Sequence, residues 1–315
     1  MKREGGYTVL ETGLAIAMST TLVLLTFGLA AMVGRGRFRD SLVTTQSFIK
    51  QQYNEVRSGI NSRLTEGSGT NADKQIIGGV CRNKLIPGNN NGCYIIGRLL
   101  TFDNDGEVGR VQASFIIAVV GPNSKWPDST KTGLDNLNVK DGSVTLYALT
   151  DTSGNDAGLN PTIKQMGSNM LMKAWLVKSG SSSLDLLYDG SHPSNYTSGN
   201  SGNNMAILRS PVDGSLVVAS KVGLKDVSAS LGISGLMELD LKNAVTNMSQ
   251  DDKLALAVRN SGLGYPGGVI CIPGGDNPAG TSNNFNVAGG NWNWGSGLNN
   301  VMSGDVVDAC KNMDQ

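Results

Sequence analysis

Apolar positions fall into three regions that differ in spacing, and the first region is the most distinctive. From Tyr7 to Val33, an almost continuous apolar run of 27 residues carries one charge, Glu11. A helix of that length reaches about 40 Å, which is more than the ~30 Å hydrocarbon core of a bilayer. The run therefore predicts a transmembrane helix over residues 7–33. A secretory signal peptide fits less well, because its apolar region is shorter and is followed by the small residues of its cleavage site.

Beyond this run, apolar residues recur with the spacing of one helical face. They are separated by 7, 4, 3, 4 and 4 residues: Leu42, Ile49, Tyr53, Val56, Ile60 and Leu64. Polar side chains occupy the opposite face: Lys50, Gln51, Asn54, Arg57 and Asn61. We therefore expect one helix over residues 7–64. Its first half is predicted to lie in the membrane and its second half to pack against a globular head.

From about residue 65 onward, the pattern is that of strands and turns. Apolar runs and alternation predict strands at residues 99–102, 108–111, 115–120, 143–150, 171–177 and 215–219. Turn-forming residues separate several of these segments: 104–106, 141–142 and 211–214. Two stretches rich in Gly, Ser and Asn are predicted to be long loops, at residues 179–204 and 274–300. Residues 236–258 show an interrupted helical pattern.

These patterns predict an α+β protein with four parts. Residues 1–6 precede the long helix of residues 7–64, a β-rich head domain covers 65–225, and a loop-rich C-terminal region covers 226–315. Gly is abundant, at 42 residues, and aromatic residues make up only 5% of the chain, which indicates many turns and modest aliphatic cores. The 26 basic and 26 acidic residues balance, so the composition does not favour a nucleic-acid partner.

The four cysteines bear on the compartment in which the protein resides. No Cys-x-x-Cys spacing occurs, and His192 is the only histidine in the sequence, which argues against a zinc site. Pairing of sequence neighbours gives the disulfides Cys81–Cys93 and Cys271–Cys310, one of three possible connectivities. Disulfides would place the head outside the cytoplasm. The alternative is four buried thiols in a reducing compartment.

The N-terminus carries a specific motif. The short charged segment Met1-Lys2-Arg3-Glu4-Gly5-Gly6 is followed directly by Tyr7-Thr8-Val9-Leu10-Glu11. Over residues 1–35, the chain resembles the processing region of type IV pilins and of the pseudopilins of type II secretion. The resemblance implies cleavage after Gly6 by a prepilin peptidase, N-methylation of Tyr7, and a pilin-like fold. Tyr7 replaces the usual phenylalanine or methionine, and Gly28 stands where many pilins carry a proline.

The resemblance also implies a function. It indicates a structural subunit of a type IV pilus or related type II secretion filament, without enzymatic activity or a cofactor. The size of the chain favours a minor rather than a major subunit. The implied partners are other pilin subunits, the prepilin peptidase, the pilus assembly machinery and the membrane. A carboxylate in a membrane helix is costly, and pairing of Glu11 with the Tyr7 amine of a neighbouring subunit would offset that cost. The alternative is a glutamate that extends toward the lipid headgroups.

Two indications of orientation disagree. Lys2 and Arg3 precede the apolar run, whereas Arg35, Arg37 and Arg39 follow it. A count of positive charges predicts that the C-terminal side faces the cytoplasm. The resemblance and the cysteines predict the opposite: an N-terminus in the cytoplasm, one membrane span, and later incorporation into an extracellular filament.

Other candidate chemistry is less specific. Asp103, Asp105 and Glu107 alternate around Gly106, a spacing seen in calcium loops. A hairpin turn between 99–102 and 108–111 explains the same residues and is the preferred interpretation.

Enzyme-like patterns are also present but incomplete. Ser47-x-x-Lys50 and Lys131-Thr132-Gly133 match two motifs of penicillin-recognising enzymes, but the Ser-x-Asn element between them is missing. Trp292 and Trp294 lie in a Gly/Asn-rich segment, where they either contact a partner or fill a small core. The alternative function is therefore a single-pass membrane-anchored exported enzyme or binding protein.

Overall fold

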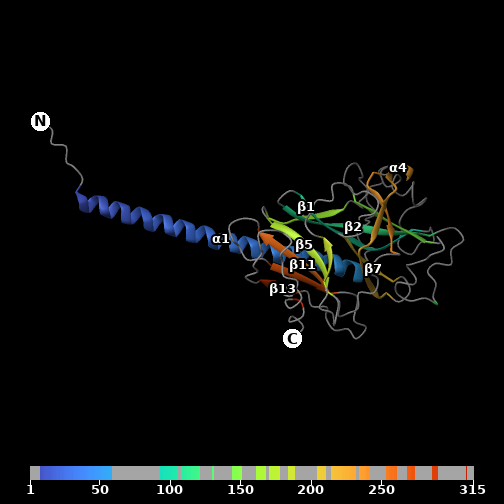
Figure 1. Cartoon of the computed structure of the whole chain (residues 1–315). Helices are drawn as coiled ribbons and strands as arrows, with labels where there is room; N and C mark the ends of the chain where they lie inside the picture. Colours follow the sequence, from blue (N-terminus) through green and yellow to red (C-terminus); the bar gives the residue numbers. More distant parts are fainter. Residues whose placement is uncertain are drawn as a thin grey trace, which may run out of the picture. The chain divides into compact units, whose positions relative to one another are not determined.

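In the part of the chain that it describes, the computed structural model contains a long helix, a short helix and thirteen strands, and the strands join in one sheet. Figure 1 shows the long helix and the β-rich part. The chain divides into two compact units, residues 1–41 and residues 42–315. The structure describes residues 8–58, 93–105, 108–120, 130, 144–150, 161–167, 170–177, 184–188, 204–210, 214–231, 234–241, 253–260, 268–273, 286–289 and 310.

Helix α1 (Val9–Arg57) is 49 residues long and begins in the first unit. Residue 7 and residues 59–64, the ends of the predicted helix, lie outside the described residues. Within the first unit, all side chains from Thr8 to Leu29 are exposed. This segment therefore presents apolar side chains in every direction around its axis.

In the second unit, residues 42–57 of α1 have one buried and one exposed face. The buried side chains follow helical spacing: Leu42, Thr45, Ile49, Gln52, Tyr53 and Val56. The exposed side chains include those predicted to face solvent: Lys50, Gln51, Asn54 and Arg57. The predicted stripe is thus confirmed as far as Val56, whereas Ile60, Asn61 and Leu64 lie outside the described residues.

The strands range from 4 to 13 residues in length. They are β1 (Cys93–Asp105), β2 (Val108–Val120), β3 (Val144–Leu149), β4 (Thr162–Gln165), β5 (Met170–Val177), β6 (Leu184–Tyr188), β7 (Asn204–Arg209), β8 (Leu216–Ser220), β9 (Gly223–Asp226), β10 (Leu236–Asp240), β11 (Lys253–Asn260), β12 (Gly268–Pro273) and β13 (Asn286–Gly289). A short helix, α4 (Ser228–Leu231), lies between β9 and β10.

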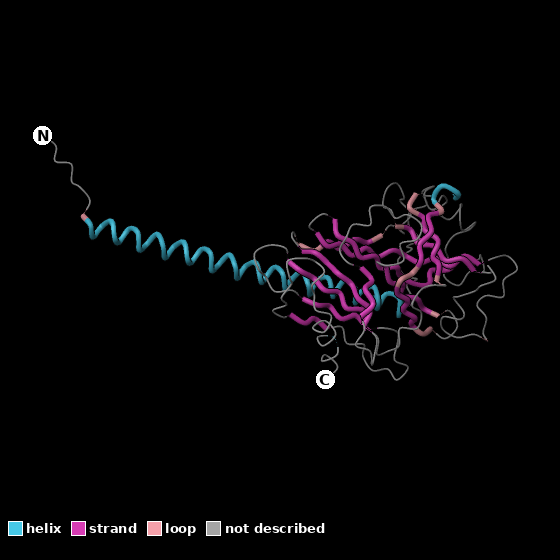
Figure 2. Tube along the Cα trace, viewed as in Figure 1, coloured by secondary structure: helices cyan, strands magenta, loops and turns pink. Residues whose placement is uncertain are grey.

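The main path of the sheet runs β13-β12-β11-β5-β2-β1-β7-β8. A branch leaves β2 through β3 to β10 and β9, while β4 pairs with β2 and β6 with β5. The pairings are antiparallel except for a single parallel contact between Val108 and Met170. Figure 2 shows that the sheet is curled. The described chain is therefore α+β, with an apolar N-terminal helix and a curled, largely antiparallel sheet.

Several predicted strands are confirmed. β2, β3, β5 and β8 occupy the expected segments. The predicted hairpin is formed by β1 and β2, whose last registered pair is Asp105 with Val108.

The prediction of a helical pattern over 236–258 is wrong, since β10 and β11 lie there. Leu236 and Leu239 have helix-like spacing, but pairing of β10 with both β3 and β9 imposes the extended form. The predicted loops 179–204 and 274–300 likewise contain β6 and β13. The boundary between the predicted head domain (65–225) and the predicted C-terminal region (226–315) stays a prediction. Strands from both sides of this boundary belong to the same sheet.

The central strand β1 is buried on both faces. Leu99 belongs to an apolar cluster that also includes residues of β2, β3, β7, β8 and β10. The curl of the sheet thus brings its branch over the same core as its main path. Ile96 joins Leu99 in this cluster because the pairing of β1 with β2 shifts between Ile95 and Gly97. A side chain at Gly97 would collide with the backbone carbonyl oxygen of Ile207 in β7.

The opposite face of β1 contacts α1. Arg98 Nη2 lies 2.7 Å from Glu55 Oε2, and both side chains are largely buried. The Arg98 guanidinium also stacks on the ring of Phe115 in β2, 3.4 Å from the ring centroid. Farther along the sheet, the Leu42 side chain occupies the space that a Cβ would need at Gly268 in β12. An ion pair and close apolar packing therefore hold residues 42–57 of α1 against the sheet.

Candidate functional site

The N-terminal part of α1 has the physical properties of a membrane span. Residues Val9–Leu29 form a helical segment of 21 residues that is long and apolar enough to cross a bilayer, and none of it is buried in the protein. Val9 is 91% exposed and Phe27 is 72% exposed. Surface of this kind is stable only when lipid or another protein covers it.

Glu11 lies in the first turn of this helix and is hydrogen-bonded to Thr8. The backbone N–H of Thr8 donates to Glu11 Oε2 at 2.9 Å, and the Thr8 hydroxyl donates to the same oxygen at 3.1 Å. The Glu11 N–H in turn lies 3.3 Å from Thr8 Oγ1. These reciprocal bonds form a capping box, with Thr8 as the N-cap.

The capping box changes how Glu11 should be interpreted. Our sequence interpretation missed it, although the Thr-x-x-Glu spacing of Thr8 and Glu11 is its signature. It supplies partners for N–H groups that have none within the helix, and it places a negative charge at the favourable helix end. Gly6 and Tyr7 lie outside the described residues, so the predicted cleavage and the pairing of Glu11 with Tyr7 stay predictions.

The hydroxyl groups within the span bond to their own helix. Ser19, Thr20, Thr21 and Thr26 each donate to a carbonyl oxygen three or four residues earlier, at 2.8 to 3.1 Å. Such bonds satisfy the hydroxyl groups locally and make them compatible with an apolar environment. In the sequence of the described segment Val9–Leu29, Glu11 is the one ionisable side chain.

The candidate calcium ligands are only partly placed by the structure. Asp103 of β1 forms a registered pair with Arg110 of β2, and Asp103 Oδ2 lies 2.5 Å from Arg110 Nη2. A cation at Asp103 would have to compete with this guanidinium. The side chain of Asp105 and all of Glu107 lie outside the described residues. Within the described ranges, no three His, Cys, Asp or Glu residues are grouped closely enough to hold a metal ion.

Only one of the two enzyme-like patterns falls on described residues. Ser47 and Lys50 are exposed on α1, and residues 131–133 lie outside the described ranges, as do His192, Trp292 and Trp294.

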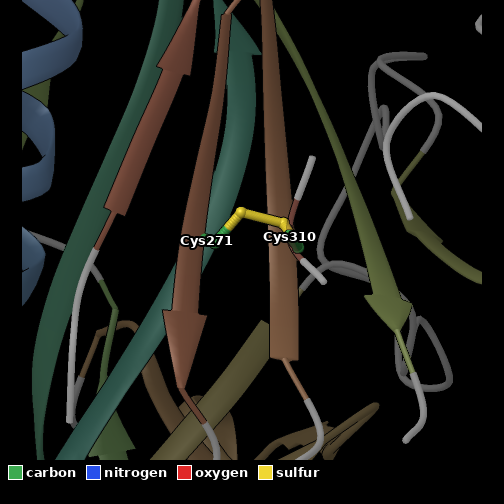
Figure 3. The surroundings of a disulfide bond; sticks show 2 residues. All are labelled: Cys271 and Cys310. Atoms are coloured by element: carbon green, nitrogen blue, oxygen red, sulfur yellow. A yellow bond between two sulfur atoms is a disulfide. The ribbon is translucent and has the colours of Figure 1, made fainter. Parts of the chain in front are cut away.

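One disulfide is present in the described chain. Cys271 of β12 is bonded to Cys310, with their Cα atoms 5.6 Å apart and a sequence separation of 39 (Figure 3). Both residues are buried, at 2% and 0% exposed. This pairing is the one predicted from sequence proximity. Cys81 and the side chain of Cys93 lie outside the described residues, so the predicted Cys81–Cys93 bond stays a prediction.

Comparison with known proteins gives no match of the chain to a protein-family model, a curated protein or a solved structure.

Proposed function

We propose that this protein is a structural subunit of a type IV pilus or a related type II secretion filament. The observation that carries the proposal is an exposed apolar helix, Val9–Leu29, with a lone carboxylate, Glu11, in its first turn. The proposal includes a pilin-like fold, because residues 42–57 of the same helix pack on a sheet. The length of 315 residues favours a minor subunit with a bulky head.

In the proposed mechanism, a prepilin peptidase removes residues 1–6 and leaves a free amine at Tyr7. Both bonds from Thr8 end on Oε2 of Glu11, and no described residue donates to Oε1. Oε1 can therefore accept a bond from the Tyr7 ammonium of a neighbouring subunit while the capping box stays intact. A charge pair of this kind in an apolar environment favours one register between adjacent helices.

The proposed location is the cytoplasmic membrane, with the N-terminus in the cytoplasm, followed by an extracellular filament. The Cys271–Cys310 disulfide supports this orientation, because disulfides persist in oxidising compartments. The proposed partners are other pilin subunits, the prepilin peptidase and the assembly machinery.

The decisive experiment separates the charge of Glu11 from its capping role. Glu11→Gln removes the charge but can keep the capping box, because glutamine also serves at that position. Thr8→Val removes the capping hydroxyl but keeps the charge. We expect Glu11→Gln to abolish incorporation into filaments and Thr8→Val to retain most of it, as measured by the amount of subunit in filaments sheared from the native host.

Membrane insertion serves as the control, and both variants should remain in the membrane fraction. Normal incorporation of Glu11→Gln would contradict the proposal. Loss of incorporation in Thr8→Val alone would show that Glu11 acts as a cap rather than as a charge.

A further inference from the structure

Two arginines follow the apolar segment of α1. Arg37 and Arg39 are exposed, and in the described part of the chain neither forms an ion pair. Asp40 is the one acidic residue beside them, and the sequence places a third arginine, Arg35, just before them. From Thr12 to Gly34 the sequence contains no charge, so the arginines are the first charged groups beyond the predicted membrane span.

Helix geometry places these arginines near the level of lipid phosphates. Arg37 follows Leu29 by eight residues, which corresponds to about 12 Å along the helix axis. The polar headgroup layer extends roughly 5–8 Å beyond the hydrocarbon core. Because a long arginine side chain can extend several ångströms back toward the interface, its guanidinium can reach that layer.

The two side chains leave the helix in different directions. Residues two apart are separated by about 200° around an α-helix. Arg37 and Arg39 therefore point to opposite sides of α1 and cannot share one phosphate. A guanidinium binds a phosphate through two parallel hydrogen bonds, which a lysine ammonium cannot reproduce.

We propose that Arg37 and Arg39 form a binding site for anionic phospholipids, with one headgroup phosphate on each side of the helix. The site holds the C-terminal end of the membrane span at the level of the headgroups. It is independent of the proposed filament function, because it requires only that α1 spans a membrane and not that residues 1–6 are removed.

The test measures lipid preference at the protein surface. The full chain is reconstituted in phosphatidylcholine vesicles, and electron spin resonance compares the association of spin-labelled phosphatidylglycerol with that of spin-labelled phosphatidylcholine. The wild type should prefer phosphatidylglycerol. Each arginine should contribute up to about fivefold to the preference. Arg37→Gln/Arg39→Gln should therefore lose most of it, and glutamine preserves the helix because it is a good helix former.

Lys50→Gln provides the matched control, since Lys50 is also exposed on α1 but lies well beyond the apolar segment. This variant should keep the wild-type preference. An unchanged preference in the double arginine variant would overturn the proposal, as would an equal loss in Lys50→Gln. Glu11→Gln should keep the lipid preference while losing filament incorporation, which separates failure of this proposal from failure of the filament function.

Discussion

Tyr147 and Glu238 face one another across β3 and β10 as a registered antiparallel pair. Burial of the phenol raises the pKa of Tyr147, and the negative charge of Glu238 raises it further. A hydrogen bond with the Thr145 side chain acts in the opposite direction. Folding therefore disfavours the charged phenolate at this position.

This shift predicts how stability depends on alkaline pH. A group whose pKa is higher in the folded than in the unfolded state stabilises the folded protein. This contribution is fully present below the pKa of the unfolded state, about 10 for tyrosine, and it is lost as the pH rises through the pKa of the folded state. We expect Tyr147→Phe to lose less unfolding free energy than the wild type between about pH 9 and pH 11, as measured by urea unfolding followed by circular dichroism. Glu238→Gln should reduce the dependence to a smaller extent. Identical pH profiles for wild type and Tyr147→Phe would refute this assignment.

At the scale of elements, the buried pair Glu55–Arg98 joins α1 to the central strand. Arg98→Met removes the guanidinium that pairs with the largely buried Glu55 carboxylate, and breaking a buried ion pair in this way typically costs about 3–5 kcal/mol. We therefore expect Arg98→Met to lower the unfolding free energy by roughly this amount. The double variant Glu55→Gln/Arg98→Met should lose clearly less than the sum of the single variants.

A double-mutant cycle based on urea unfolding measures this coupling. The cycle matters because Arg98 also stacks on Phe115, and that contact is lost in every variant that lacks the arginine. If the losses of unfolding free energy in the two single variants add up to the loss in the double variant, the ion pair contributes nothing beyond packing.

Sequence patterns predicted the elements better than the contacts between them. The stripe from Leu42 to Val56 was recognisable because helical spacing is local, and the β1–β2 hairpin because its turn residues are adjacent. The contact of Glu55 with Arg98 joins residues 43 positions apart, and no local pattern marks it. The strand β10 was missed because pairing with β3 and β9, rather than its own spacing, determines its conformation.

The candidate site was predicted in composition but not in geometry. The single charge of the apolar run was evident from the sequence. The bonds between Thr8 and Glu11 also have a local signature, the Thr-x-x-Glu spacing, whereas the resemblance to pilins implies a partner for Glu11 in another subunit. One side chain can serve both purposes because a carboxylate has two oxygens.

At the scale of the whole molecule, N-terminal processing distinguishes a filament subunit from a membrane-anchored enzyme or binding protein. We expect mass spectrometry of the protein extracted from its native membrane to show an N-terminus at Tyr7. Co-expression with an inactive prepilin peptidase is the control and should leave Met1 in place. An intact Met1 in the presence of active peptidase would favour the anchored alternative.

The bond between Cys271 and Cys310 has a further consequence for the head in its proposed extracellular location, where proteases are abundant. Hydrolysis of any peptide bond between these two residues would yield two fragments that remain covalently linked through sulfur. A nicked head could thus keep its last segment attached to β12 for as long as its surroundings stay oxidising.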